Sequence, residues 1–220
     1  MTVHDVARLL PNIPRLRDLS RAMAVLEAIL SPDWNTRYHS FSADWSPEEE
    51  LASMRNGSGD EYSIVFSPAG ACIRGFDHES VMSPYVNDVP WPGVLDDVPA
   101  VFRQFFEESA FCDDGIPIVT ACLWRRIEDD LWHAGEIDFP EGGSDPDGAS
   151  WRFALLTDPA PEAFQRFAED YYEVSIDVAA VRHVYTLRPL TQQVVSALNP
   201  DLSLMDLAED LKAAHYPAKV

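Results

Sequence analysis

The fold class is decided by the stretch "RNGSGDEYSIVFSPAGACIRGFDHES", residues 55–80. Two apolar runs, 61–67 and 71–76, are joined by a Pro-Ala-Gly segment, which is the pattern of a β-hairpin with a short turn. The glycines of "NGSGD" end the element that comes before the hairpin. The residues that we expect in the core of the hairpin are Ile64, Val65, Phe66, Cys72 and Ile73.

The segments on either side of this hairpin predict further strands and several helices. Apolar residues at helical spacing predict helices over 14–30 and 98–106. Ser46, Pro47 and Glu49 follow the order of a capping box, so we expect a short helix or helical turn over 46–54. The remaining predicted strands are 116–126, 131–139 and 151–157, and the remaining predicted helices are 158–173, 176–187, 191–198 and 202–215.

Together these elements predict an α+β fold. It consists of an antiparallel sheet of about five strands with an N-terminal helix, intervening helices and a C-terminal helical cluster. A chain of 220 residues with 46% hydrophobic content suits a single domain with a packed core. We divide this domain, 1–220, into an N-terminal helical segment (1–33), a sheet-rich acidic core (34–157) and a helical C-terminal part (158–220).

The charge of the chain is strongly negative and unevenly distributed. Sixteen basic residues against thirty-seven acidic ones give a net charge of −21. Residues 38–180 hold seven arginines and twenty-nine acidic residues, so this region alone carries −22. Such a field repels nucleic acid and attracts a basic protein, and it also favours solubility. The charge therefore indicates either a basic protein partner or a purely solubilising surface.

No membrane or secretory segment is expected. The chain lacks a run of about 18 apolar residues, and its N-terminus has early charges and prolines. Cys72, Cys112 and Cys122 lack CxxC spacing, and two of them sit in apolar runs. We therefore expect a cytoplasmic protein without a disulfide framework.

The best catalytic candidate is the triplet Asp77-His78-Glu79, where a carboxylate could orient an imidazole. His133, in the segment "LWHAGEID", could join it in a shared pocket. The alternative is an acidic loop at the end of a strand, because neighbours in an extended chain point to opposite faces. The segment "EGGSDPDGAS", 141–150, reads as a turn and not as a calcium loop. No motif predicts a cofactor, and no spacing predicts a metal site.

Aromatic residues next to carboxylates predict a surface that binds a protein partner. Tyr85 and Trp91 lie in a proline-rich loop with acidic neighbours, and Trp45 follows Asp44. Aromatic anchors rimmed by carboxylates suit the recognition of a basic protein. The alternative is that each ring folds back into the core. The predicted partner-binding residues are Trp45, Asp60, Glu61, Asp77, Glu79, Tyr85, Asp88, Trp91, Asp96 and Asp97.

The succession of "RNGSGDEYSIVFSPAGACIRGFDHES", "PWPGVLDDVPAVFRQF" and "ACLW…LWHAGEIDFP" resembles uncharacterised bacterial proteins of this length. In character these are similar to the small acidic immunity proteins that neutralise polymorphic toxins. The resemblance implies a cytoplasmic, non-enzymatic α+β inhibitor whose acidic face occupies the basic cleft of a toxin or nuclease. It implies no catalytic residues.

The sequence therefore favours a non-enzymatic, acidic protein-binding module that needs neither nucleic acid nor a membrane as its partner. The alternative is an enzyme of unrecognised type with a His/Asp/Glu site around residues 77–79 and 133. A third interpretation is a structural or regulatory domain that forms a homodimer through its closing helices, 191–215.

Overall fold

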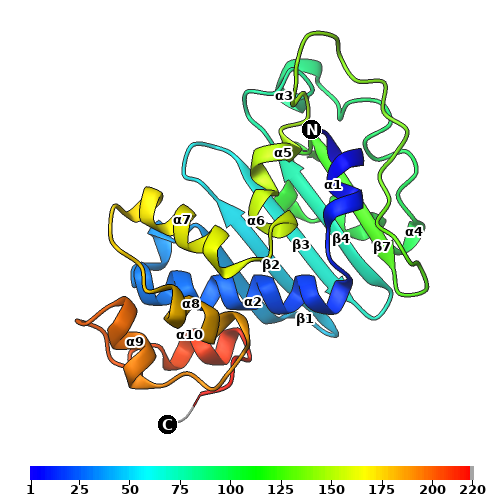
Figure 1. Ribbon diagram of the computed structural model, residues 1–220. Coiled ribbons are helices and arrows are strands. Elements are labelled where there is room, and N and C mark those ends of the chain that lie inside the picture. Colours follow the sequence, from blue (N-terminus) through cyan, green and yellow to red (C-terminus); the bar gives the residue numbers. More distant parts are fainter. Residues whose placement is uncertain (219–220) are drawn as a thin grey trace. The chain divides into compact units, whose positions relative to one another are not determined.

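The computed structural model describes residues 1–218 and contains an antiparallel sheet of five strands. The strand order is β1 (His39–Ser46), β2 (Glu49–Arg55), β3 (Glu61–Ser67), β4 (Gly70–Phe76) and β7 (Ala121–Arg126). Helices precede the sheet, interrupt it and follow it along the chain (Figure 1). The α+β class predicted from the sequence is confirmed.

The contacts between residues group the chain into two compact units. Unit 1 combines Met1–Ile13 with Ser53–Thr157, and unit 2 combines Pro14–Ala52 with the residues from Asp158 onward. Residues 157 and 158 lie in different units, and residues 33 and 34 both lie in unit 2. The first residues of the chain belong to the unit of the acidic core because α1 (Val3–Leu9) packs against β7.

The centre of unit 1 is the predicted hairpin of β3 and β4. The two strands pair in antiparallel register from Glu61↔Phe76 to Ser67↔Gly70, and β4 pairs in turn with β7. Every residue of β4 is buried, which explains why the sequence shows a continuous apolar run instead of an alternation. The five residues predicted as the core of this hairpin are all at most 2% exposed.

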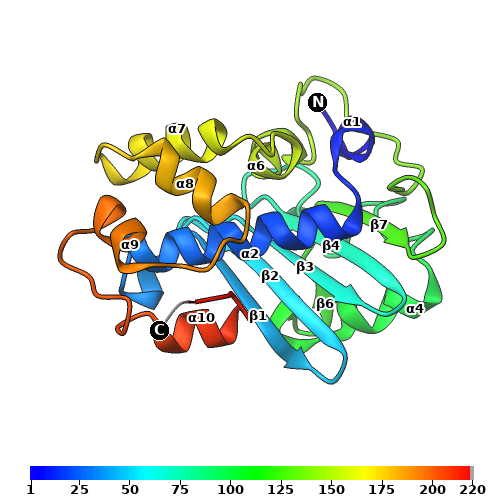
Figure 2. The same cartoon turned by 60° about the horizontal axis from the view of Figure 1, so that its bottom comes forward.

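Chain segments cover both faces of β4 and β7. Figure 2 shows α1 on one side of these strands and α4 (Ala100–Arg103) on the other. Gly75 in β4 makes room for one of the covering side chains, because a Cβ there would lie 2.7 Å from the ring of Phe153. The other short elements of unit 1 are α3 (Pro84–Asn87), η2 (Gln104–Glu107), η3 (Ser109–Phe111), β5 (Cys112–Asp113), β6 (Ile116–Pro117), α5 (Ala149–Arg152) and α6 (Ala154–Thr157).

Three local predictions were wrong, although the number of strands was right. Residues 46–54 form a turn and β2 instead of a helix, because Ser46 Oγ donates to Glu49 Oε2 across a hairpin turn with Glu48 at a φ of 67°. Residues 151–157 form α5 and α6 instead of a strand. Of 131–139, only His133 pairs with the sheet, as an isolated bridge to Trp124.

Unit 2 is built on α2 (Ile13–Leu30), the predicted N-terminal helix. Its residues at helical spacing, Leu16, Leu19, Met23, Leu26 and Ile29, are at most 1% exposed. The four C-terminal helices are also present, with α7 packed on α8 and α8 on α9. Their bounds are α7 (Pro161–Tyr172), α8 (Val178–Tyr185), α9 (Gln192–Leu198) and α10 (Ala208–Ala213), and the short η1 (Trp34–Thr36) follows α2.

A buried carboxylate lies inside unit 2. Glu27 of α2 is 0% exposed. It accepts hydrogen bonds from the Tyr38 amide at 3.0 Å, from His39 Nδ1 at 3.1 Å and from the hydroxyl of Tyr172. Three donors from two segments of the chain, residues 38–39 and α7, therefore converge on one buried charge, which makes this network a strong structural constraint.

Candidate functional site

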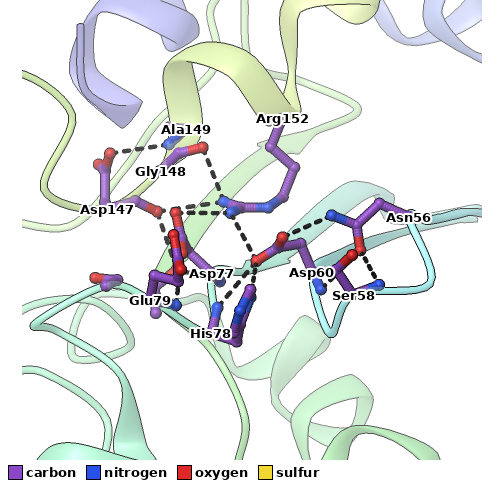
Figure 3. A network of polar contacts seen from close by, with 12 residues as sticks. Asn56, Ser58, Asp60, Asp77, His78, Glu79, Asp147, Gly148, Ala149 and Arg152 are labelled. Atoms are coloured by element: carbon purple, nitrogen blue, oxygen red, sulfur yellow. Dashed lines mark hydrogen bonds and ion pairs between the residues drawn. The ribbon is translucent and has the colours of Figure 1, made fainter. Parts of the chain in front are cut away.

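A network of charged side chains lies at the end of the β3–β4 ladder, where Glu61 pairs with Phe76 (Figure 3). The loop before β3 contributes Asp60, and the loop after β4 contributes Asp77 and His78. Because the two loops continue from paired strand ends, they bring residues that are 17 or more positions apart in sequence into contact. Arg152 of α5 completes the network, and all of these residues belong to unit 1.

The guanidinium of Arg152 is the centre of the network, and its side chain is 0% exposed. Nη2 lies 3.0 Å from Asp77 Oδ2 and 3.8 Å from Asp60 Oδ1, and Nη1 donates to the Gly148 carbonyl at 2.8 Å. Burial lowers the pKa of Arg152, while the Asp77 and Asp60 carboxylates oppose this shift. Since arginine stays protonated at ordinary pH, a buried positive charge is compensated here by two carboxylates.

Asp60 also binds the imidazole of His78. Asp60 Oδ1 accepts from His78 Nδ1 at 2.8 Å and from the His78 amide at 3.0 Å, and Asp60 Oδ2 accepts from Asn56 Nδ2 at 2.6 Å. Burial pushes the pKa of Asp60 upward, but the hydrogen bonds from His78 and Asn56 outweigh it, so the net pKa is lowered. The hydrogen bond to Asp60 raises the pKa of His78, whose side chain is 41% exposed.

Asp147 and Gly148 hold α5, and thereby Arg152, in place. The buried Asp147 carboxylate accepts from the amides of Val3 and Ala149, at 2.9 and 3.1 Å. Burial raises the pKa of Asp147 to about 6. Gly148 has a φ of 65°, and a Cβ at this position would lie 2.1 Å from Asp77 Oδ2. Glycine is therefore required here both by the left-handed backbone and by the close approach of the Asp77–Arg152 pair.

Metal binding is one chemistry that the residue types permit. Asp60, Asp77 and His78 offer ligand atoms that lie within 4.8 Å of one another. However, the Arg152 guanidinium already lies between the two carboxylates, and its positive charge opposes a second cation. The geometry is that of an ion-pair network and not of a carboxylate cage for a divalent ion.

General-base chemistry is the second possibility. A carboxylate that accepts from Nδ1 fixes the orientation and the tautomer of an imidazole, as Asp60 does for His78. Two hydroxyls of this region are committed to the backbone, since Ser80 Oγ donates to the Pro146 carbonyl at 2.6 Å and Thr120 Oγ1 donates to the Asp147 carbonyl at 2.9 Å. The arrangement therefore supplies an oriented base but does not use either hydroxyl as a nucleophile.

Comparisons with known proteins do not assign this chain to a family. No family model, no curated protein and no solved structure matches the chain significantly. Within residues 1–218, none of the helices combines the length and the apolar character needed to cross a bilayer.

The structure brings together only part of the predicted catalytic set. Asp77 and His78 belong to the network, whereas Glu79 is exposed and donates only its amide to Asp77 Oδ1. His133 pairs with Trp124, which lies opposite Cys72 in β4. Cys72 is four residues before the end of β4, so His133 and the network are separated by about 13 Å along the strand, at about 3.3 Å per residue. The structure therefore places His133 away from His78.

The predicted partner-binding residues fall into three environments, the first of which is the ion-pair network around Arg152 that holds Asp60 and Asp77. Glu61 is half-buried and pairs with Arg74 of β4 at 2.6 Å. Trp91 is half-buried, with its Nε1 donating to the Asp138 carbonyl at 3.0 Å, and Trp45 is half-buried in unit 2. The exposed members of the set are Glu79, Tyr85, Asp88, Asp96 and Asp97.

Residues 79–89, which we call the 79–89 segment, contain four exposed apolar side chains. Val81, Tyr85, Val86 and Val89 are 56%, 62%, 68% and 55% exposed. The carboxylates of Glu79 and Asp88 lie in the same segment and are also exposed. Its backbone is held by hydrogen bonds within the segment, because Ser83 caps α3 and Asn87 Nδ2 donates to the carbonyls of Val81 and Ser83.

The residues that the sequence analysis missed are Arg74, Asp147 and Arg152. Asp147 lies in the polar segment "SDPDGAS", whereas Arg74 and Arg152 lie within apolar runs, "ACIRGF" and "SWRFALL". A charged residue in such a run must find a buried partner, because a fully buried unpaired charge is rare. This signal predicts the existence of an ion-pair network, but it does not identify the partners.

Proposed function

We propose that this chain is a non-enzymatic module that binds a basic protein partner through the 79–89 segment of unit 1. The observation that carries the proposal is the exposure of four apolar side chains, Val81, Tyr85, Val86 and Val89, in a segment rimmed by carboxylates. Clustered apolar side chains on a surface mark interaction sites, and an exposed tyrosine is a frequent hot spot. An immunity-type inhibitor of a basic toxin or nuclease is the class of protein that this proposal favours.

The charge of unit 1 defines the chemistry of the partner. Unit 1 contains seven arginines and twenty aspartates and glutamates, and two residues of each sign are buried: Arg74, Arg152, Asp60 and Asp147. The outward field is therefore strongly negative. Such a field increases the rate of association with a basic protein and disfavours nucleic acid.

The ion-pair network around Arg152 helps to hold the 79–89 segment in one conformation. Asp77 precedes the 79–89 segment and accepts a hydrogen bond from the amide of Glu79, its first residue, and Arg152 holds the side chain of Asp77. Ser80 Oγ then fixes the loop to the Pro146 carbonyl. A segment that is held in one conformation loses less entropy on binding, so preorganisation increases affinity.

The test is a binding measurement with the double variant Tyr85→Ala/Val86→Ser. Affinity capture with the wild-type chain should yield a protein with a high isoelectric point, and calorimetry with this purified protein gives its Kd. We expect the double variant to weaken binding by about 30-fold or more, since truncating a central aromatic anchor costs about 2 kcal/mol or more. Added salt should slow the association of the wild-type chain.

Leu131→Ser is the matched control, because Leu131 is an exposed apolar residue of the same unit, 69% exposed, outside the 79–89 segment. It should bind as the wild-type chain does. Capture of an acidic protein, or equal affinities of the double variant and the wild type, would contradict the proposal. Dimerisation through residues 191–215 stays a prediction.

The second candidate function is an enzyme with His78 as general base, and the Asp60–His78 pair favours it. Because the hydrogen bond to Asp60 raises the pKa of His78, the basic form should appear only above the usual value of 6.5. Turnover would then rise with pH through the raised pKa, His78→Ala would abolish it, and Asp60→Asn would shift the profile to lower pH. A screen of esters, phosphoesters and peptides with the three proteins checks this.

The raised pKa of His78 also makes the stability of the folded chain depend on pH. A histidine whose pKa is raised on folding stabilises the folded chain below the unfolded value of 6.5, and this contribution disappears as the pH rises through the folded pKa. An NMR titration of the His78 ring measures the pKa directly in the wild-type chain and in Asp60→Asn. If His78 titrates identically in both, the described hydrogen bond does not control it.

A further inference from the structure

A cavity of about 620 Å³ lies in unit 2 beside α10, the helix that packs against β1 (Figure 2). This volume falls within the range of about 300–1,000 Å³ that is typical of sites for small organic ligands. Two of the lining residues, Lys212 and His215, have basic side chains. The other lining residues are apolar or aromatic: Leu204, Met205, Ala208, Leu211, Tyr216 and Ala218. Such a wall is typical of a site for a largely apolar ligand.

Hydrogen bonds to other parts of unit 2 hold the wall of this cavity in place. The hydroxyl of Tyr216 donates to the carbonyls of Val184 and Arg188, at 3.2 and 2.9 Å. His215 Nε2 lies 3.0 Å from Asp44 Oδ2 of β1. The phenol proton of Tyr216 and Nε2 of His215 are therefore engaged by the protein itself, and a wall that is held in this way is preformed, as ligand sites usually are.

Lys212 gives this cavity a positive charge that the protein does not neutralise. Its side chain is exposed, and among residues 1–218 no side chain forms an ion pair or a hydrogen bond with its ammonium. The neighbouring carboxylate on α10, that of Asp210, pairs instead with Arg37 at 2.5 Å. The chain has thirty-seven acidic residues, yet none of those described lines the cavity. A lysine lays its methylene stem on apolar surface and keeps its ammonium in water, so the charge belongs at the mouth of the cavity.

An apolar interior with one cation at its mouth matches an amphipathic anion. We propose that this cavity binds a single-chain fatty acid, whose aliphatic chain lies in the cavity and whose carboxylate pairs with the Lys212 ammonium. Each methylene that leaves water for the apolar wall favours binding. A dianionic phosphate head matches less well, because one lysine leaves its second charge in the negative field of a chain with a net charge of −21.

Met205 supports an aliphatic ligand over a rigid one. It lines the cavity and is 81% exposed, so a ligand that covers it removes a large apolar side chain from water. Methionine has three rotatable bonds and adapts to the shape of its partner, as a flexible aliphatic chain also does. The site lies in unit 2 and the 79–89 segment in unit 1, so this inference does not rest on the proposed function.

The experiment is a titration of the full chain with dodecanoate below its critical micelle concentration, followed by calorimetry and by NMR. We expect saturable binding, with nuclear Overhauser contacts between the ligand chain and the methyl groups of Leu204 and Leu211. Dodecyltrimethylammonium has the same chain with the opposite charge and should bind about tenfold more weakly. Octanoate has the same head with four fewer methylenes and should also bind about tenfold more weakly, or worse.

Lys212→Gln tests the carboxylate partner. It should weaken the binding of dodecanoate by about fivefold, the effect of a partly exposed ion pair, and should leave the binding of dodecyltrimethylammonium unweakened. Arg166→Gln is the matched control, because Arg166 is a cation of the same unit, 68% exposed, that does not line the cavity. This control should bind dodecanoate as the wild-type chain does.

Met205→Glu tests the cavity itself, because it replaces an exposed apolar side chain of the wall by a carboxylate. It should weaken the binding of dodecanoate by about tenfold or more. Val174→Glu introduces the same charge at another exposed apolar position of unit 2, 48% exposed and outside the cavity. It should have no effect. The NMR spectra of all variants show whether they are folded.

Four results would overturn the inference. They are the absence of saturable binding of dodecanoate, equal binding of dodecyltrimethylammonium, equal effects of Met205→Glu and Val174→Glu, and ligand contacts outside the residues that line the cavity. A wild-type chain that sediments as a dimer, becomes a monomer in Met205→Glu and binds no dodecanoate would assign the cavity to a second copy of the chain instead.

Discussion

Replacing Arg152 by methionine is expected to lower the free energy of unfolding by about 3–5 kcal/mol, the range observed when one partner of a buried ion pair is removed. Arg152 is fully buried, and its Nη2 lies 3.0 Å from Asp77 and 3.8 Å from Asp60. Methionine fills much of the volume but leaves both carboxylates without their counter-charge and the Gly148 carbonyl without its donor. Urea unfolding followed by tryptophan fluorescence measures the loss.

Arg8→Met is the matched control for this substitution. Arg8 belongs to the same unit and pairs with Asp5 at 3.0 Å, but its side chain is 74% exposed. An exposed pair contributes about 0–1 kcal/mol, so this variant should unfold almost as the wild type does. Adding Asp77→Asn to Arg152→Met should restore part of the stability, because it removes one of the two orphaned charges. Equal stabilities of Arg152→Met and Arg8→Met would show that the network is not structural.

The hairpin at the centre of the fold was predictable because its signal is local. Two apolar runs and a Pro-Ala-Gly turn fix the pairing of β3 with β4, and the same register extends outward to place Asp60 opposite Asp77. The contact between Asp60 and His78 was therefore predictable from the sequence. The triplet 77–79 does not reveal this contact by itself, because adjacent side chains of an extended chain point to opposite faces.

The rest of the site depends on long-range packing. Arg152 lies 75 positions after Asp77, in a segment whose apolar run was interpreted as a strand. Its buried residues, Arg152, Phe153 and Leu156, have helical spacing. A run of only seven residues, however, does not clearly distinguish the period of a helix, about 3.6 residues, from that of a strand, about two residues. Similarly, the Ser46–Glu49 pair that predicted a helix cap closes a hairpin turn, because tertiary pairing with the sheet overrides a local preference.

Replacing Glu27 by leucine should lower the free energy of unfolding by about 3–5 kcal/mol, because three donors lose a buried acceptor at a cost of at least about 1 kcal/mol each. These donors are the Tyr38 amide, His39 Nδ1 and the Tyr172 hydroxyl. Leucine has a similar volume, so the expected loss comes from hydrogen bonding and not from a cavity. Thermal and urea unfolding both measure it.

Glu27→Gln separates hydrogen bonding from charge, because a glutamine keeps one acceptor oxygen. Tyr38 and Tyr172 both donate to Oε2, so an amide oxygen in that position preserves both of these bonds. The amide nitrogen then faces His39, whose Nδ1 can accept in the other neutral tautomer. We therefore expect a loss of only about 1 kcal/mol. Burial and the Glu27 carboxylate together raise the pKa of Tyr172, so in Glu27→Gln the phenol should titrate at a lower pH. If glutamine proved as damaging as leucine, the negative charge itself would be what unit 2 requires.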